Sequence, residues 1–443
     1  MSLTRDLVKL IRARTVEPQD FQAAALMTLD GVANALAGRN SGPGRILLNW
    51  HHQRNNQSDD PARLAFMHGA LTHILETDDL HRASVTHPGC VVIPAAFALA
   101  QHRGHGGQQT LTAILQGFEA MSRVGMAVGG LHYKIWHNTA TCGPFGSAMA
   151  AAHLFDLNDE QCVHALGNAG TQSSGLWQFL DTGAMSKHLH AGRAAESGLL
   201  AADLASFGFT GPPEILEGAQ GFFAAACPDA IPDKVLAETA DRWQLAVTSI
   251  KPWPSCRHTH PTIDCALEIS ELAGSGLAVD QIEQIEVNTY GVALDVCDRA
   301  SPDNDYAAKF SLQHCVSAAL ADGAVDFSSF DNAARDRLEN FRQKVTVRTA
   351  DPWASAYPVS WGAEVVLTLK DGQVLKAQRK NCYGDPESAL SKNQMTDKAR
   401  MLLAHGGLND SQAEELIDSV LAMADDGPVP DLGLLRDQGG AQT

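Results

Sequence analysis

The sequence predicts a mainly α-helical protein with an inserted α+β domain, and three observations lead to this prediction. With 443 residues, the chain is longer than one simple core usually holds, so two domains are expected. Its first 245 residues are dense in Ala, Leu and Met, whereas alternating apolar and polar residues are concentrated in the middle of the chain. We therefore expect residues 1–245 and 391–443 to form one helical domain and residues 246–390 to form an α+β domain.

The helical prediction rests on apolar residues that recur at three- and four-residue spacing. This pattern is clearest over residues 61–76, 109–129 and 193–208. It returns over residues 392–407 and 410–425, after the middle block. Both ends of the chain are therefore assigned to the same domain.

The middle block shows the period-two pattern of strands. Residues 282–291 and 344–351 alternate apolar and polar side chains, which predicts two strands. Residues 363–380 predict a β-hairpin with Lys370-Asp371-Gly372 at its turn. Helical patterns over residues 261–274 and 309–323 lie between these strands.

Composition excludes several classes of partner. The chain has 33 Lys and Arg against 51 Asp and Glu, a formal net charge of −18, which argues against nucleic acid and anionic membrane surfaces. Charges interrupt the apolar positions of the first 16 residues, and no stretch approaches the roughly 20 apolar residues of a membrane helix. We expect a cytoplasmic protein.

The nine cysteines are spread singly along the chain, and no CxxC pair occurs. This pattern disfavours a zinc ribbon, an iron–sulfur cluster and a disulfide framework. We expect most of these residues to be buried, reduced thiols. We predict no metal and no cofactor.

A first candidate segment, residues 76–89, mixes acidic and basic side chains. Glu76, Asp78 and Asp79 are followed by His81, Arg82 and His87. A helix ending near Leu80, followed by a loop, would place an acid, a base and a cation together. The alternative is a solvated helix end followed by a turn.

The second and third segments each contribute one residue of interest. His137 precedes a Thr- and Gly-rich helix start, and His132, five residues away, does not share its helical face, so a metal pair is disfavoured. Lys187 precedes a run of small residues that packs closely, and partial desolvation there would make it a usable base. The alternatives are a capping or core histidine and a surface lysine. His188 and His190 have HxH spacing, but no third ligand pattern accompanies them.

The fourth segment, residues 249–264, carries Lys251, Ser255, Arg257 and His258 between prolines. Ser255, Arg257 and His258 are typical of a carboxylate-binding loop. A zinc site at this CxH and HxH spacing is disfavoured, because no partner motif appears. The four segments would concentrate positive charge in an acidic protein if the fold brings them together.

Six blocks of this sequence resemble, in order and over nearly the whole chain, those of the MmgE/PrpD family. They are HILETDDLHRASVTHPGCVVIPAAFALA (73–100), WHNTATCGPFGSAMAAAHLFDL (136–157), SKHLHAGRAAESGLLAADLASFGFTGPPEILEGAQGF (186–222), IKPWPSCRHTHPTIDCAL (250–267), AKFSLQHCVSAAL (308–320) and YGDPE (383–387).

The resemblance implies a helical domain with an inserted α+β lid domain, a homodimer, and proton transfer at carbon near a carboxylate without an iron–sulfur cluster. The family includes 2-methylcitrate dehydratase, cis-aconitate decarboxylase and iminodisuccinate epimerase. By position, its active-site histidines match His87 and His137, and its lysines match Lys187 and Lys251. With His81 added, we predict His81, His87, His137 and Lys187 as catalytic.

The predicted substrate-binding residues come from three of these blocks. They are Glu76, Asp78, Arg82, Lys251, Ser255, Arg257, His258 and Tyr383. We expect a substrate with at least two carboxylates, one held by Arg82 in the helical domain and the other by Lys251, Arg257 and His258 in the lid.

The chain departs from decarboxylase-like members in the segment predicted to meet the substrate. It has Glu76 in place of an Asp and Leu80 in place of a Thr, and the loop to His87 is one residue longer. These departures disfavour cis-aconitate decarboxylase activity in particular. The leading hypothesis is a hydro-lyase similar to 2-methylcitrate dehydratase. An epimerase of a dicarboxylate and an inactive carboxylate-binding protein are the alternatives, because dehydration and epimerisation both need two proton-transfer groups.

Overall fold

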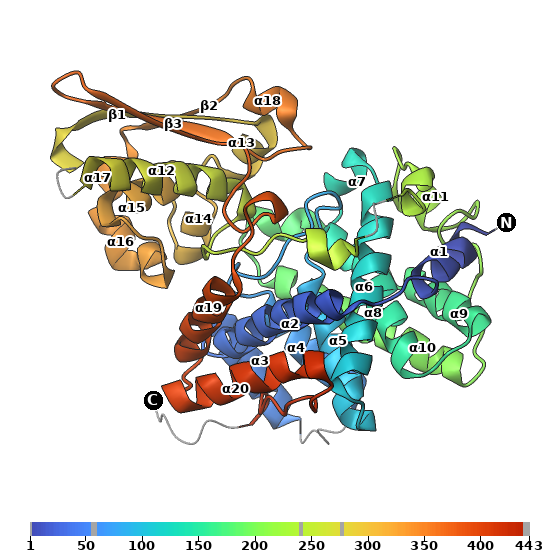
Figure 1. Ribbon diagram of the computed structural model, residues 1–443. Helices are drawn as coiled ribbons and strands as arrows, with labels where there is room; N and C mark the ends of the chain where they lie inside the picture. The colour runs from blue at the N-terminus through green and yellow to red at the C-terminus, as the bar shows by residue number, and fades with distance from the viewer. Residues whose placement is uncertain (1, 55–59, 239–241, 275–278, 437–443) are drawn as a thin grey trace. The chain divides into compact units, whose positions relative to one another are not determined.

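The computed structural model describes residues 2–54, 60–238, 242–274 and 279–436. The chain divides into two compact units, residues 1–248 with 391–443 and residues 249–390 (Figure 1). The sequence placed the first boundary at 245/246 and the second at 390/391. Unit 1 is helical and unit 2 is α+β, so the predicted fold class is confirmed.

Unit 1 is built from helices of both ends of the chain. Its α-helices are α1 (Leu3–Arg12), α2 (Pro18–Gly38), α3 (Gly42–Gln53), α4 (Pro61–Thr72), α5 (Gly89–Arg103), α6 (Gly107–Ala127), α7 (Gly130–Tyr133), α8 (Asn138–Leu154), α9 (Asp159–Gly170), α10 (Ser186–Ser206), α11 (Phe222–Ala226), α19 (Lys392–His405) and α20 (Asp410–Ala422). Its 3-10 helices are η1 (Trp177–Asp181), η2 (Pro232–Val235), η3 (Gln244–Val247) and η9 (Met423–Asp425).

Helix α8 lies at the centre of unit 1, packed against α5, α6 and α10. It is buried along almost its whole length, and its small side chains allow its neighbours to approach closely. The contact with α10 requires glycine at position 198, since a Cβ there would lie 2.0 Å from Ser147 Oγ and 2.4 Å from the Pro144 carbonyl oxygen. This packing holds the first turns of α8 and α10, which carry functional candidates, in fixed positions.

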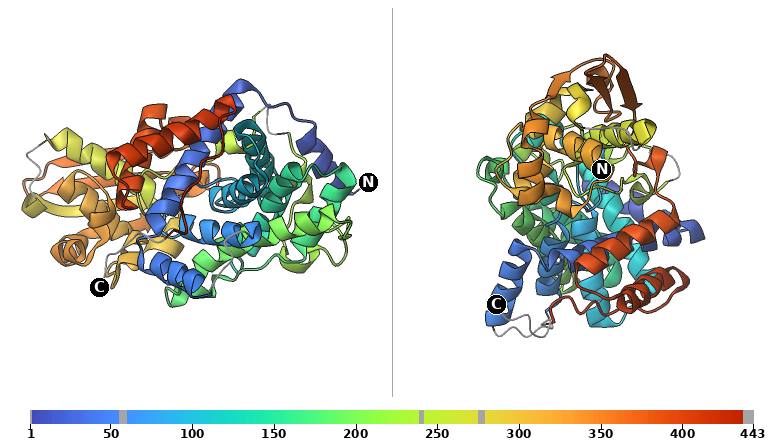
Figure 2. Two further views of the ribbon diagram at one scale, coloured as in Figure 1. Left: turned by 90° about the horizontal axis from the view of Figure 1, so that it is seen from below. Right: turned by 90° about the vertical axis from the view of Figure 1, so that its left-hand side faces the viewer.

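The C-terminal helices α19 and α20 lie beside α2, near the other end of the sequence (Figures 1 and 2). The contact is fastened by Lys398 of α19, whose Nζ lies 2.5 Å from Asp30 Oδ1 of α2. The same ammonium donates a hydrogen bond of 2.7 Å to the carbonyl oxygen of Thr77. Lys398, Asp30 and Thr77 are all buried. The C-terminal segment thus fixes the loop that follows α4.

Unit 2 contains one mixed four-stranded sheet and the helices around it. Its strands are β1 (Ile282–Thr289), β2 (Val345–Thr349), β3 (Ala363–Leu369) and β4 (Val374–Arg379), in the spatial order β2-β1-β3-β4. Its α-helices are α12 (His260–Ala273), α13 (Gly291–Cys297), α14 (Asp305–Lys309), α15 (Leu312–Asp322), α16 (Asn332–Arg337), α17 (Glu339–Arg342) and α18 (Trp353–Ala356). Its 3-10 helices are η4 (Arg257–Thr259), η6 (Val279–Gln281), η7 (Phe327–Phe330) and η8 (Pro386–Ser388).

The predicted strands and hairpin of unit 2 are confirmed. β1 pairs parallel with β2 and antiparallel with β3, and β3 pairs antiparallel with β4 through the turn at Lys370-Asp371-Gly372. Gly372 has φ +88°, which explains glycine at this turn position. Ile285 and Val287 of β1 join Ile263 and Val316, from α12 and α15, in one buried core.

One predicted helix boundary in unit 1 was wrong. Helix α4 ends at Thr72, not near Leu80, because Glu76 has a left-handed φ of +64° that no α-helix accommodates. Helix α10 begins at Ser186, so that Lys187 lies in its first turn. The loop between α4 and α5 is therefore longer than expected, and it is buried along most of its length.

Among the described residues, no helix combines the length and the apolar character needed to cross a membrane.

The anchor made by Lys398 predicts a large effect on stability. Lys398→Met should lower the free energy of unfolding by about 3–5 kcal/mol, because Asp30 would stay buried without the cation that pairs with it. Chemical denaturation measures this change. The control is Lys392→Met on the same helix, whose exposed side chain predicts a change within about 0.5 kcal/mol. Equal stabilities of the two variants would contradict the anchor, whereas partial recovery in the double variant Asp30→Asn/Lys398→Met would support it.

Candidate active site

Three of the four predicted segments gather in unit 1. The loop of residues 73–88, the start of α8 at His137 and the first turn of α10 at Lys187 lie together. The fourth segment, residues 249–264, belongs to unit 2 and is described separately below.

The loop between α4 and α5 is held by its own polar groups. Both carboxylate oxygens of Asp79 accept a hydrogen bond of 3.0 Å from the backbone N–H of Gly89, at the N-terminus of α5. The carbonyl oxygen of Asp79 accepts a hydrogen bond of 2.5 Å from His87 Nδ1. Since a carbonyl oxygen only accepts, the proton of a neutral His87 is on Nδ1 and its lone pair is on Nε2.

His73, at the end of α4, lies at the centre of the cluster. Its Nδ1 is 2.6 Å from Asp78 Oδ2, and both side chains are buried. Its ring centroid is 4.8 Å from that of His87 and 5.7 Å from that of His137, against which it stacks at 11°. No sequence pattern selected His73 by itself, although it begins the first of the six blocks.

His137 is the buried base candidate. Its backbone N–H donates a hydrogen bond of 3.0 Å to the Gly175 carbonyl oxygen, and its Nδ1 lies 3.3 Å from His190 Nδ1. Its Nε2 is buried and has no hydrogen-bond partner among the described residues. Burial, followed by the charges of His73, His190, Lys187 and His87, holds the pKa of His137 well below its ordinary value. The ring is therefore neutral at ordinary pH and can accept a proton.

Lys187 is paired with Glu76. The ammonium and the carboxylate form an ion pair, and their side chains are only 7% and 2% exposed. A buried carboxylate favours the charged form of the lysine, so this geometry suits a cation better than the base expected from the sequence. Glu76, predicted to bind substrate, has Lys187 as its partner.

His81 is held in place by hydrogen bonds to its ring. Its Nδ1 lies 2.8 Å from Ser84 Oγ and its Nε2 lies 2.9 Å from Gln244 Oε1, so both ring nitrogens are engaged. Burial lowers the pKa of His81 to about 4. These contacts hold the loop, and we leave His81 out of the proposed proton transfer. Arg82, beside it, is half-buried.

In unit 2, Arg257 and His258 contact groups of that unit. Arg257 forms an ion pair with Asp385 and a hydrogen bond of 2.6 Å to Cys382 Sγ. His258 lies 2.8 Å from the Tyr290 hydroxyl and stacks on Trp361 at 4.6 Å. Burial and the charge of Arg257 lower the pKa of His258 to about 3. These contacts stabilise the loop itself, and a direct role of either residue in carboxylate binding stays a prediction.

Three further residues of unit 2, Lys251, Ser255 and Tyr383, were predicted to bind substrate, and this role also stays a prediction. Lys251 is fully buried, and Ser255 Oγ lies 2.9 Å from Thr259 Oγ1. The Tyr383 backbone N–H donates a hydrogen bond of 2.7 Å to Asp264. Tyr383 also lines a cavity of about 400 Å³. The charged residues in the lining of this cavity are Asp264, Glu268, Glu271 and Arg379. This lining is mostly acidic and does not favour a carboxylate.

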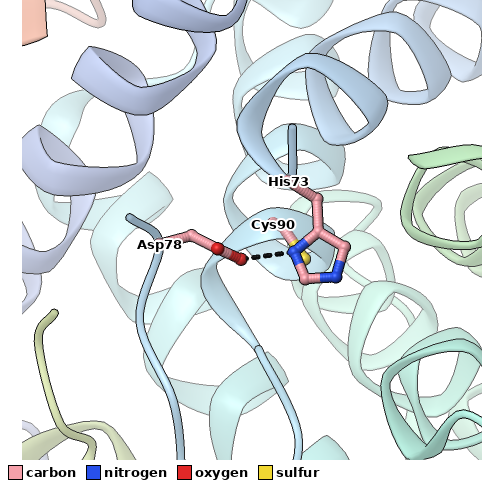
Figure 3. A group of neighbouring side chains, drawn as sticks. All are labelled: His73, Asp78 and Cys90. Carbon is pink, nitrogen blue, oxygen red and sulfur yellow. Dashed lines mark hydrogen bonds and ion pairs between the residues drawn. The ribbon is translucent and has the colours of Figure 1, made fainter. Parts of the chain in front are cut away.

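Three side chains near the centre of the cluster have the atom types of a metal site. His73, Asp78 and Cys90 place one nitrogen, one oxygen and one sulfur atom within 4.8 Å of one another (Figure 3). Asp78 Oδ2, however, is bonded to His73 Nδ1, and the Cys90 thiol donates to the His87 carbonyl oxygen at 3.2 Å. Burial, followed by the charges of Asp78 and Asp79, raises the pKa of Cys90 well above its ordinary value. A metal would have to break the first bond and deprotonate the thiol, so the group fits a hydrogen-bonded His–Asp pair better than a metal site.

Comparison with known proteins identifies the family of this chain. Residues 5–234 match the model of the MmgE/PrpD N-terminal domain, and residues 253–423 match that of the MmgE/PrpD C-terminal domain. The chain belongs to the MmgE/PrpD family. The family resemblance predicted from the six blocks is thereby confirmed.

Relatives of this MmgE/PrpD protein include enzymes. A cis-aconitate decarboxylase-like protein of Aspergillus oryzae is 25% identical over 94% of each chain. A human cis-aconitate decarboxylase is 26% identical over 77% of this chain and 72% of its own length. A cis-aconitate decarboxylase of Aspergillus terreus is 25% identical over 82% of this chain and 78% of its own length. The prediction that this chain is an enzyme is confirmed.

The bonds within the His73, Asp78 and Cys90 group predict that activity does not depend on a metal. Prolonged treatment with EDTA should leave turnover unchanged in the wild-type enzyme. Cys90→Ser, which removes the sulfur donor, should respond to EDTA in the same way. Loss of activity with EDTA that a divalent ion restores would contradict this prediction.

Proposed function

We propose that this MmgE/PrpD enzyme is a metal-independent lyase that acts by proton transfer at a carbon next to a carboxylate of a small tricarboxylic acid. Removal of water from a hydroxylated tricarboxylate, similar to the reaction of 2-methylcitrate dehydratase, is the reaction that we favour. The observation that carries the proposal is the neutral, buried His137, whose Nε2 has no partner among the described residues, close to the Lys187–Glu76 ion pair.

The proposed elimination uses two groups of the cluster. His137 Nε2 removes the proton from the carbon next to the carboxylate, and the electrons of the C–H bond form the new double bond. The C–O bond to the hydroxyl breaks as the Lys187 ammonium gives that oxygen a proton, so water leaves. The elimination needs one group that takes up a proton and a second group that gives one up. Neutral His137 and charged Lys187 are separate residues that can fill these two roles.

Negative charge builds up on the substrate carboxylate during proton removal, so cations and N–H donors must be in place before the reaction. Lys187 supplies a cation whose charge already acts on His137. His73 stacks against His137, and the Nδ1 atoms of His73 and His87 are held by Asp78 and Asp79. A cation and rings that are already fixed in place need little reorganisation as the charge develops.

Decarboxylation is the second candidate, because several relatives are named cis-aconitate decarboxylases. In that reaction, the C–C bond to one carboxylate breaks, carbon dioxide leaves, and a protein group protonates the carbon. Because its lowered pKa keeps His137 neutral, the ring seldom carries a proton that it could give to that carbon, which is why we rank dehydration first.

Proton NMR in heavy water separates the candidate reactions in one experiment. The purified enzyme would be incubated with 2-methylcitrate, citrate, cis-aconitate and a chiral dicarboxylate. Dehydration of citrate gives a vinyl proton signal, and dehydration of 2-methylcitrate turns its methyl doublet into the singlet of a methyl group on a double bond. Decarboxylation replaces the vinyl signal of cis-aconitate by the signals of its product as carbon dioxide leaves. Exchange with inversion in the dicarboxylate alone would establish an epimerase instead. No change in any acid would contradict the proposed function and favour a binding protein.

Loss of either proton-transfer group should reduce turnover. His137→Ala and Lys187→Ala are each expected to lower kcat by about 10²-fold or more, the range for general acid–base catalysis. The matched controls are His102→Ala and Lys134→Ala, whose side chains are exposed and should stay within about twofold of wild type. Wild-type turnover in a folded His137 or Lys187 variant would refute its role.

We further propose that the enzyme works as a homodimer paired through α10. Leu189, Leu200 and Leu204 are exposed along one side of this helix, and Phe207, which follows it, is 85% exposed. Exposed apolar side chains that gather on one helix can mark a protein–protein contact. The nine cysteines are buried thiols spread singly along the chain, which fits a reducing compartment such as the cytoplasm.

The proposed dimer predicts that Leu200→Glu combined with Leu204→Glu shifts the protein from dimer to monomer at micromolar concentration. Analytical ultracentrifugation measures the change, with Lys392→Glu as a surface control. A wild-type monomer in the same experiment would contradict the dimer.

A further inference from the structure

A second histidine, His190, lies directly against the proposed base. The Nδ1 atoms of His190 and His137 are 3.3 Å apart, and their ring centroids are 5.5 Å apart. His190 is half-buried and lines a cavity of about 620 Å³ between α8, α10 and the segment of residues 172–184. We propose that His190 is a positioning residue that accepts a hydrogen bond from the Nδ1–H group of His137. This bond keeps the lone pair of His137 on Nε2, where it can act as the base. This inference rests on the proposed function of His137.

The direction of the hydrogen bond follows from the surroundings of the two rings. Only one of two facing ring nitrogens can carry the proton that they share. If His190 were the donor, the proton of neutral His137 would be on Nε2, which is buried without a partner among the described residues. A buried N–H without an acceptor is rarer in proteins than a buried acceptor without a donor. His190 can keep its own proton on the other nitrogen, because its side chain lines a cavity.

This arrangement assists the reaction in two ways. Before the reaction, the bond from His137 Nδ1–H to His190 leaves the lone pair of His137 on Nε2. When Nε2 takes the substrate proton, the ring becomes an imidazolium, and its Nδ1–H bond to His190 becomes a stronger, charge-assisted hydrogen bond. The Nδ1–H bond itself does not break.

The electrostatic setting of His190 suits an acceptor. Burial, followed by the charges of His73 and Lys187, lowers the pKa of His190 to about 4. A neutral His190 retains the lone pair that the bond requires. The ring centroid of Phe179 lies 5.5 Å from that of His190. Phe179 packs against His190 and has no group that could form a hydrogen bond with it.

Two substitutions of similar size separate the acceptor role from packing. His190→Asn places an amide oxygen near the former Nδ1 position and should keep kcat within about fivefold of wild type. His190→Leu fills the space without an acceptor and should lower kcat by about 10- to 100-fold, with little change in KM, since tautomer control acts on the chemical step. Equal kcat values for the Asn and Leu variants would overturn the inference.

Rescue by free imidazole gives a second test. His190→Ala opens space beside the cavity, and imidazole should restore at least part of the lost kcat. His137→Ala should show no comparable rescue. Gln178 lines the same cavity, and Gln178→Ala should retain wild-type kcat with or without imidazole. Failure of rescue in folded His190→Ala would count against the inference, whereas full activity of His137→Ala would refute the proposed function itself.

Discussion

The site depends on one constraint: the polar loop between α4 and α5 must be buried and yet keep its groups paired. Burial makes unpaired polar groups costly, so some groups of the loop pair with one another and others are held from other parts of unit 1. Lys398 reaches Thr77 from the C-terminal helix α19, and Asp79 caps α5. Glu76 meets Lys187 of α10. The loop therefore has little freedom to move, and the groups that depend on it are held in position.

The same burial explains the chemistry that we propose. A histidine removed from water and surrounded by other basic groups stays neutral, which is the state required of a base. A lysine beside a buried carboxylate stays charged, which is the state required of a donor. One cluster can thus hold an acid and a base at the same pH, and no metal is required for either. The net negative charge of the chain does not by itself exclude an anionic substrate, because the buried Lys187 supplies a local cation.

Much of the fold could be predicted, because local patterns determine it. The hairpin over residues 363–380 was found from alternation and from the Lys370-Asp371-Gly372 turn, and the helices at both ends were found from their spacing. The end of α4 was missed because the left-handed turn at Glu76 depends on tertiary contacts and has no glycine to mark it. The role of His73 was missed for a related reason, since its contact with Asp78 forms only after the chain turns back. Arg257 illustrates the same limit, because its partner Asp385 lies 128 residues away.

The central claim is that His137 is a neutral base at the pH at which the enzyme works. It is tested most directly by NMR of the enzyme with ¹⁵N-labelled histidine, titrated with acid and with His137→Ala used to assign the signal. We expect the His137 ring to be still neutral at pH values below the ordinary histidine pKa of about 6.5, because burial lowers its pKa. An imidazolium that forms near pH 6.5 would contradict this role, because His137 would then be an ordinary, solvated histidine.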